Sequence, residues 1–355
     1  MIKEHAMLPL LAKLIRYNKT KRRRNSNGSA IVTGTNQNYE MLSKLLQKFE
    51  EHTKFKLVIY EMVRTNKREQ KKVQKYWQVF YTSFTDYLYN TQNCNDNYVG
   101  QNIKLLKAFL NWTAKDLGLI IGQEHKKFYV PHETIPIIVL EPQMLNFLIY
   151  SKDFTSTLSL SMNQIKDLFV FGCTVGLRYS DLKELKHHSV ERIFGRHYLV
   201  TVSQKTRTPT KVMLPRYAVD IIEKYSDKKR KLLLPYPSIA QFNLKIKRLI
   251  EIAGWTHEVP KIRTKRGSPH EIKCINNKHY RYCDLVSSHC MRKTAITTLL
   301  RLGLNENLVR KISGHSPGSK AFYKYVELSQ SYMDEEIGKA HDKLAAKFNH
   351  VDCNS

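Results

Sequence analysis

The spacing of apolar residues predicts a chain made mainly of amphipathic helices. From Tyr39 onward, apolar side chains recur three or four residues apart on one helix face, at Leu42, Leu45, Leu46 and Phe49. Residues 98–117 show the same spacing behind caps at Asn95 to Asn97, and residues 76–89 form an aromatic-rich helical segment. We therefore expect a small helical bundle over residues 37–125.

The second half of the chain mixes helices with short strands. Pro131, Pro136 and Pro142 break the helical pattern in residues 126–142, which are expected to form an extended linker because proline excludes a continuous helix. In residues 143–328, apolar and polar residues alternate at 198–201 and 211–214, between helical segments. This mixture predicts an α+β domain, and a fold class that is mainly α with a small β-sheet.

The two ends of the chain differ in character. Residues 1–36 join a polar stretch to eight lysines and arginines among the first 25 residues, and are expected to form a flexible basic arm. Residues 329–355 are expected to form a C-terminal helix and tail. Their apolar stripe suits either packing on the chain's own core or contact with a second protomer, and it consists of Met333, Ile337, Leu344 and Phe348.

Charge indicates a nucleic acid partner. Lys and Arg number 59 against 31 Asp and Glu, which gives a net charge of +28. A polyanion is the natural counterpart of such self-repulsion, and double-stranded DNA is the expected partner. A second basic run, residues 260–281, lies just before His289. The residues expected to contact DNA are Lys104, Lys107, Lys261, Arg263, Lys265 and Arg266.

The cysteines and the apolar run near the N-terminus indicate where in the cell the protein is expected to be. The six cysteines form no CxxC pair, so they are expected to be reduced thiols, and no zinc-ligand spacing predicts a metal site. The run from Met7 to Ala12 is too short for a secretory signal or a membrane span. The expected location is the cytoplasm, in association with the nucleoid and not with a membrane.

An ordered set of side chains in the C-terminal half predicts a phosphate-directed active site. The set is Arg178 in GLRYSDL, Lys205 in SQKTRT, His289 and Arg292 in SSHCMRKT, His315 in SGHS and Tyr325 in AFYKYV. Two arginines, two histidines and a lysine at one point would place donors on every phosphate oxygen, and a nearby tyrosine hydroxyl could attack it. Taken singly, each residue also has an ordinary interpretation as a surface or core side chain.

Local patterns favour this gathering. His289 and Arg292 lie three residues apart at the start of a helix, so both project from one face. Asp181 follows Arg178 by three residues and is placed to hold its guanidinium. Gly314 is expected to end the preceding helix and to present His315 on a tight turn.

In this order the motifs resemble those of the tyrosine recombinase (phage integrase) family, from about Tyr39 to Val326. The resemblance implies a SAM-like core-binding domain at residues 37–125, a catalytic domain at residues 143–328 and a C-shaped clamp on DNA. It implies that the tyrosine attacks a scissile phosphate and forms a 3′-phosphotyrosyl link. Arg178, Arg292 and His315 would bind the phosphate, His289 and Lys205 would transfer protons, and no metal or cofactor is required.

The resemblance also implies a biological role and partners. They are site-specific recombination for a phage or another mobile element, a homotetramer on two duplexes, and accessory DNA-bending or directionality proteins. Two alternatives stay open: a type IB topoisomerase-like enzyme, and a noncatalytic DNA-binding protein on the same scaffold. The first would relax a plasmid that lacks any specific site. The second would bind DNA without forming a covalent adduct.

Two tyrosines compete for the role of nucleophile, because Tyr323 and Tyr325 follow His315 by eight and ten residues. Two residues along a helix turn about 200°, so the two hydroxyls cannot both face one site. Tyr325 shares a face with Phe322 and Val326, which must turn inward, and it is the expected nucleophile. The alternative makes Tyr325 a core aromatic and Tyr323 the attacking residue.

Overall fold

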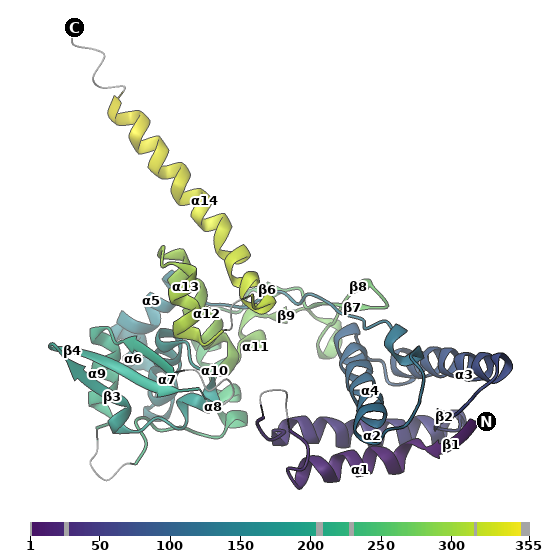
Figure 1. Ribbon diagram of the computed structural model, residues 1–355. Helices are drawn as coiled ribbons and strands as arrows, with labels where there is room; N and C mark the ends of the chain where they lie inside the picture. The colour runs from purple at the N-terminus through teal and green to yellow at the C-terminus, as the bar shows by residue number, and fades with distance from the viewer. Residues whose placement is uncertain (1, 25–27, 204–208, 227–230, 316–317, 349–355) are drawn as a thin grey trace. The chain divides into compact units, whose positions relative to one another are not determined.

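The computed structural model describes residues 2–24, 28–203, 209–226, 231–315 and 318–348. The chain forms two compact units (Figure 1). The first combines residues 1–135 with 261–272, and the second combines residues 136–260 with 273–355. The break at Ile135 lies within the linker expected at residues 126–142, but the assignment of residues 261–272 to the first unit differs from the expected division.

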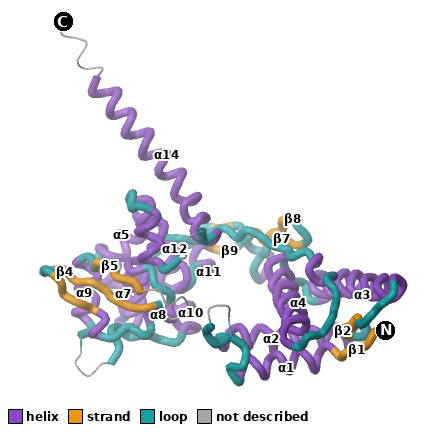
Figure 2. Tube along the Cα trace, viewed as in Figure 1, coloured by secondary structure: helices purple, strands orange, loops and turns teal. Residues whose placement is uncertain are grey.

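The first unit is a helical bundle with two short two-stranded sheets (Figure 2). Its elements before the linker are β1 (Ile2–Ala6), α1 (Met7–Lys19), α2 (Thr33–Thr53), β2 (Val58–Met62), α3 (Lys67–Asp86), a π-helical turn (Tyr87–Thr91), α4 (Asp96–Asp116) and a 3-10 turn (Glu124–Lys127). An aromatic cluster fills the core, in which Phe49 contacts the rings of Phe80, Phe84 and Tyr87 edge to face. The helical bundle expected for this region is confirmed.

The N-terminal residues are folded, so the expectation of a flexible arm is wrong for residues 2–19. β1 pairs antiparallel with β2, with Ile2 opposite Met62. α1 buries Met7, Leu11 and Leu14 completely. These residues are four and three positions apart and form one helix face, and Pro9 lies in the first turn, where no helical N–H is lost. The basic residues of α1 therefore belong to the surface of an ordered helix.

A hairpin from the second half of the sequence completes the first unit. It consists of β7 (Ile262–Lys265) and β8 (Ser268–Glu271). Asp96, only 2% exposed, accepts hydrogen bonds from the backbone N–H groups of Arg266 and Gly267 at 2.8 and 2.9 Å. The Tyr89 hydroxyl donates to the same carboxylate at 2.7 Å. A buried carboxylate needs such donors, so the hydrogen bonds to Asp96 hold the hairpin in place.

A second buried carboxylate holds the other end of the hairpin. Glu133 pairs with Arg263 at 2.5 Å and accepts from the Thr264 backbone N–H at 2.6 Å. Burial alone would raise the pKa of Glu133, but these hydrogen bonds and that from the Asn97 N–H outweigh it and lower the pKa. Glu133 is therefore ionised at neutral pH, and it fixes two hairpin residues directly.

The second unit combines a group of helices with a three-stranded sheet at its edge (Figure 1). Its elements are α5 (Pro142–Tyr150), α6 (Lys152–Thr157), α7 (Leu160–Val175), α8 (Tyr179–Leu182), a 3-10 turn (His187–Ser189), β3 (Val190–Ile193), β4 (Arg196–Val202), β5 (Pro209–Met213), α9 (Arg216–Lys224), α10 (Ile239–Ile252), β6 (Glu258–Val259), a 3-10 turn (Ile275–Asn277), β9 (Tyr280–Arg281), α11 (Tyr282–Leu285), α12 (Ser288–Arg301), α13 (Glu306–Ser313) and α14 (Lys320–Phe348). The main sheet runs β3-β4-β5, antiparallel throughout.

Helices α7 and α12 pack closely in the core. A Cβ on Gly172 of α7 would lie 2.2 Å from the Met291 sulfur of α12, so only glycine permits this approach. α7 ends at Gly176, whose φ of +66° is the left-handed conformation that favours glycine. The extended segment before α5 also contacts α12, because the Leu140 N–H donates to Thr294 Oγ1 at 3.0 Å.

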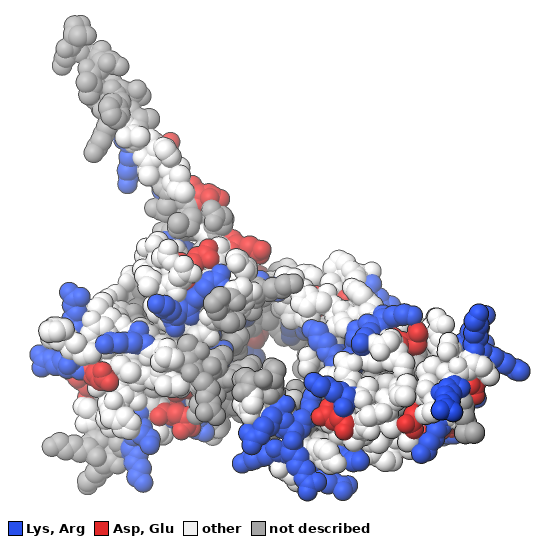
Figure 3. Space-filling view, in the orientation of Figure 1, with Lys and Arg blue, Asp and Glu red and all other residues white. Residues whose placement is uncertain are grey.

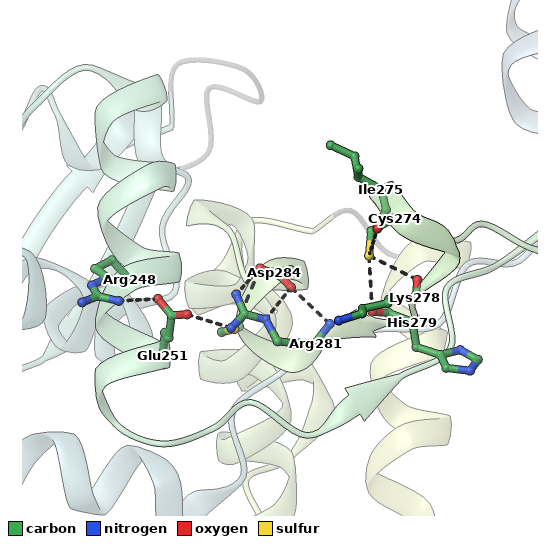
Figure 4. A network of polar contacts seen from close by, with 9 residues as sticks. Arg248, Glu251, Cys274, Ile275, Lys278, His279, Arg281 and Asp284 are labelled. Carbon is green, nitrogen blue, oxygen red and sulfur yellow. Dashed lines mark hydrogen bonds and ion pairs between the residues drawn. The ribbon is translucent and has the colours of Figure 1, made fainter.

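A polar network fixes the chain just before α12 (Figure 4). Arg281 donates to Glu251 of α10 at 2.7 Å and to Asp284 of α11 at 3.0 Å. Arg248 donates to the other oxygen of Glu251 at 2.7 Å. Because Arg281 pairs with carboxylates from two helices, it joins α10 to α11 immediately before α12.

The C-terminal segment is one long helix and not a separate tail helix. α14 runs from Lys320 to Phe348 and includes both candidate tyrosines. Leu302, which follows α12, and Leu308 of α13 are both exposed. Among the described residues, no helix is both long and apolar enough to span a membrane.

Replacement of Asp96 tests the attachment of the hairpin. Asp96→Ala leaves two backbone N–H groups and a buried hydroxyl without an acceptor, and we expect it to destabilise the first unit by roughly 3 kcal/mol. Hydrogen exchange of α4 and hairpin peptides in increasing urea measures this. Asp86→Ala is the control, since the Asp86–Arg266 pair is 45% and 47% exposed and contributes about 1 kcal/mol or less. Equal effects of the two changes would contradict the buried-charge explanation.

Candidate active site

Arg292 lies at the centre of the candidate site. It projects from the first turns of α12 and is 3% exposed. One guanidinium nitrogen donates to the Gly176 carbonyl at 3.0 Å, and the other donates to the Ser313 carbonyl. These carbonyls lie at the C-terminal ends of α7 and α13, where helix dipoles favour a cation. Burial and the nearby Arg178 lower the pKa of Arg292 to about 10, so it stays charged at neutral pH.

Arg178 is held by a relay through a serine. It follows the Gly176 turn and precedes α8. Its Nη1 donates to Ser203 Oγ at 3.1 Å, and Ser203 Oγ donates to Asp181 at 3.2 Å. Asp181 also lies 3.9 Å from the guanidinium, so the expected contact between the two is present. Ser203 itself was not predicted, because its buried place at the end of β4 depends on the sheet.

His315 lies beside Arg292 on the turn that the left-handed Gly314 makes after α13. Its Nδ1 is 2.8 Å from Ser313 Oγ, and both ring nitrogens lie 3.4 Å from Arg292 Nη2. Burial and the charges of Arg292, Arg178 and Arg310 lower the pKa of His315 to about 4. The ring is therefore neutral at physiological pH, and it offers one N–H donor instead of a positive charge.

The structure places the two tyrosines differently. The Tyr325 ring is 6% exposed and lies 6.1 Å from the His315 ring, whereas Tyr323 is 48% exposed. Burial raises the pKa of the Tyr325 hydroxyl, while Arg292 and Arg178 act in the opposite direction. Tyr325 also belongs to a small core cluster with Phe322 and Val309, as the alternative assignment supposed. It is nevertheless the tyrosine within the field of both arginines.

The two remaining predicted site residues are His289 and Lys205. His289 precedes Arg292 by one turn of α12 and is exposed. Desolvation and the charges of Lys293, Arg292 and Arg178 lower its pKa, which favours the neutral imidazole that a proton acceptor requires. Lys205 lies outside the described residues, between the end of β4 at Val202 and the start of β5 at Pro209.

The four residues Arg178, Arg292, His315 and Tyr325 thus meet at one place. Two fixed cations and a neutral donor suit the doubly charged oxygens of a phosphate under attack. The Tyr325 residue beside them is only 6% exposed. Among the described residues, no group of three or more His, Cys, Asp or Glu side chains is placed to hold a metal ion. The five cysteines within the described residues are free.

The residues expected to contact DNA lie in varied settings. Lys104 is exposed on α4, whereas Lys107 donates to the backbone carbonyls of Lys126 and Phe128 at 2.8 and 2.9 Å. In the hairpin, Lys265 contacts Asn93 and Lys261 is half-buried. Arg263 pairs with Glu133, and Arg266 pairs with Asp86 at 2.6 Å and stacks on Tyr89.

A basic surface that these predictions omitted lies at the end of α1. Figure 3 shows lysines and arginines gathered over the C-terminal part of α1 and the segment after it. The exposed cations there are Arg16, Lys19, Lys21, Arg22 and Arg24. Lys19 pairs with Glu40 at 2.8 Å. The charge count indicated these residues, but only the fold shows that an ordered helix carries the first of them.

Comparison with known proteins agrees with the family resemblance of the sequence motifs. The sequence model of the phage integrase family matches residues 143–331. No curated protein sequence matches the chain. Among solved structures, the Tn1549 transposon integrase in complex with transposon right end DNA is similar, with a TM-score of 0.56 and 13% identity over 94% of this chain and 99% of that chain.

Structures of lambda integrase are similar as well. The dimer bound to a COC′ core site has a TM-score of 0.52 and 11% identity over 91% of this chain and 77% of that chain. The tetramer bound to a Holliday junction has a TM-score of 0.50 and 13% identity over 89% of this chain and 76% of that chain. At these identities the likeness shows the fold alone.

The low pKa of His315 predicts a pH dependence of stability. The unfolded chain protonates this histidine below its ordinary pKa of 6.5, whereas the folded chain does so only near 4. The free energy of unfolding should therefore fall as the pH drops from about 6.5 toward 4. Urea unfolding at pH 7 and pH 5 measures this, and His315→Gln should show a smaller difference between the two. An equal difference in the variant would contradict the low pKa.

Proposed function

The chain belongs to the phage integrase family of tyrosine recombinases, and we propose that it cuts and rejoins DNA at specific sites through a 3′-phosphotyrosyl intermediate. The observation that carries this proposal is the meeting of Arg178, Arg292, His315 and Tyr325 at one place in the second unit. Their chemistry is that of a phosphate-binding centre with a nucleophile. The family match covers all four residues.

In the proposed cleavage step, the Tyr325 oxygen bonds to the scissile phosphorus while the bond to the 5′ oxygen breaks. His289 takes the hydroxyl proton, for which its lowered pKa and exposed position are suited. Lys205 gives a proton to the leaving 5′ oxygen. Rejoining reverses these steps, with a 5′ hydroxyl from the partner duplex as the attacking group, so the phosphodiester energy is conserved.

The charged groups have separate tasks in this step. Arg178 and Arg292 neutralise the pentacoordinate phosphorane, and each is fixed in advance by hydrogen bonds to the protein. His315 is neutral, so it donates one hydrogen bond to a nonbridging oxygen. Nε2 makes this contact in the tautomer in which Nδ1 carries no proton and accepts from Ser313 Oγ, 2.8 Å away.

The proposed substrate is double-stranded DNA of a phage or another mobile element. Two solved integrases that share this fold were captured on transposon right end DNA and on a core site. DNA contacts are proposed for Lys104, Lys107, Lys261, Arg263, Lys265 and Arg266, with the basic end of α1 as an additional surface. Accessory DNA-bending or directionality proteins are proposed partners, and the nucleoid is the proposed place of action.

The main alternative is a type IB topoisomerase-like enzyme. It would relax a supercoiled plasmid of any sequence, whereas a recombinase needs its own site. Sequencing of the DNA trapped covalently on denatured protein separates the two, because a recombinase yields one recurring junction and a topoisomerase yields many. The same experiment shows whether the protein is attached at the 3′ end. A complete lack of adduct would favour a noncatalytic DNA-binding protein.

The two tyrosines provide the first test. Tyr325→Phe removes the proposed nucleophile, so it should bind DNA like the parent and form no covalent adduct. Tyr323→Phe serves as the matched control and should keep substantial cleavage, because Tyr323 is half exposed whereas Tyr325 is buried. Denaturing gels of labelled DNA detect the adduct. The opposite pattern would transfer the catalytic role to Tyr323.

The second test concerns assembly. We propose a homotetramer on two duplexes, in which the C-terminal part of α14 docks on a neighbouring protomer. Ile337 and Leu344 lie seven residues apart on one face of α14, and both are exposed. In Figure 1 this part of the helix extends away from the body of the second unit.

Truncation after Gln330 should therefore abolish recombination between two sites while single-site binding persists. Lambda integrase, which shares the fold, has been captured as a tetramer on a Holliday junction. Recombination assays and gel shifts on the same DNA measure the two properties. Ile337→Ser with Leu344→Ser keeps the length of the helix and should reproduce the defect. Normal recombination by the truncated protein would reject this docking role.

A further inference from the structure

Arg310 is an arginine beside the site to which the proposed chemistry gives no role. It lies in the last turn of α13 and is only 9% exposed. Its guanidinium carbon is 4.1 Å from the centre of the Phe322 ring and 4.9 Å from that of the Tyr323 ring. Both rings belong to the first turns of α14. Arg310 therefore joins the helix before His315 to the helix that carries Tyr325.

The polar contacts of Arg310 are few for a buried cation. Its Nη2 pairs with Glu306 at 3.3 Å, and within the described part of the chain its buried Nη1 has no hydrogen-bond partner. A buried charge with an unused donor is costly to stability. Each cation–π contact offsets part of that cost. Phe322 and Tyr323 are thus its main attachment.

Arg310 is connected to the reacting groups on both sides. Its backbone carbonyl accepts the His315 N–H at 3.1 Å. Phe322 packs edge to face against His315 at 5.5 Å and against Tyr325 at 6.3 Å. The guanidinium, the Phe322 ring and the Tyr325 ring thus form a continuous series of contacts beside His315. A shift of the first turn of α14 would move Tyr325 relative to His315.

We propose that Arg310 is a positioning residue for DNA cleavage: held against Phe322 and Tyr323, it fixes the start of α14 and so places the Tyr325 hydroxyl beside His315 and Arg292. This inference rests on the proposed function, since it assumes that Tyr325 attacks the phosphate. It also gives Tyr323 a role through its ring and not through its hydroxyl. The hydroxyl of Tyr323 is dispensable in this arrangement.

The charge of Arg310 has a second consequence. Together with Arg292 and Arg178 it adds to the positive field that acts on His315, and burial of the ring acts in the same direction. His289 contributes as well. Loss of the Arg310 charge should raise the pKa of His315 toward its ordinary value. This effect is measurable in the free protein, without DNA.

Arg310→Met tests the inference, because methionine keeps much of the length and apolar contact and removes the charge and the planar group. The substrate is the duplex recovered by covalent trapping. We expect single-turnover cleavage to slow by about 10- to 100-fold, as a displaced nucleophile would cause, with unchanged DNA affinity. Lys311→Met, an exposed neighbour on the same helix, is the control and should cleave at the parental rate.

Two further measurements keep the test decisive. NMR titration of the His315 side chain should show a raised pKa in Arg310→Met and no change in Lys311→Met. If Arg310→Met does not fold, Tyr323→Ala removes one side of the attachment and should slow cleavage about tenfold, whereas Tyr323→Phe keeps the ring and substantial activity.

The outcomes separate this inference from the proposed function. Parental cleavage by Arg310→Met, or by Tyr323→Ala where Arg310→Met does not fold, would overturn the positioning role while the recombinase assignment stands. A loss of DNA affinity equal to the loss of cleavage would also overturn it, since Arg310 would then be a binding residue. Retention of the covalent adduct by Tyr325→Phe would instead reject the assumed nucleophile.

Discussion

The candidate site depends on one buried guanidinium, that of Arg292. A charge removed from water is costly unless donors and acceptors meet it, and here two backbone carbonyls at helix ends do so. Those carbonyls belong to Gly176 and Ser313, which immediately precede the segments that carry Arg178 and His315. The two hydrogen bonds of the Arg292 guanidinium therefore bring the start of α12 and the ends of α7 and α13 together. The carbonyl partners of Arg292 are neutral, so these hydrogen bonds do not neutralise its positive charge. A bound phosphate would supply the missing negative charge.

Buried charge also organises the first unit, with the signs reversed. Asp96 and Glu133 are carboxylates that α4 and the linker bury, and the β7–β8 hairpin supplies their donors. The hairpin is basic, which by sequence alone suggests DNA contact. Part of that charge is instead paired within the protein, as Arg263 and Arg266 show. A count of lysines and arginines therefore overstates the cations that remain available for phosphates.

Aromatic packing holds the start of the last helix, α14, beside the candidate site. α14 begins among Phe322, Tyr325 and His315, and then continues to Phe348, with exposed apolar side chains at Ile337 and Leu344. One rigid element thus carries the proposed nucleophile at one end and the proposed protomer contact at the other. If the far end docks on a neighbouring protomer as proposed, that contact and Tyr325 lie on the same helix.

The sequence by itself determined the helical class and the sheet strands β4 and β5, and it named an ordered set of candidate site residues, because period and motif order are local properties. It also indicated the Arg178–Asp181 contact from their spacing. Only the tertiary structure decided that residues 2–19 are folded, that residues 261–272 belong to the first unit, and that Ser203 and Arg310 lie beside the site. These depend on contacts between residues far apart in sequence, such as Asp96 with Gly267, which no local period encodes. The burial that makes His315 neutral is likewise a property of the assembled core.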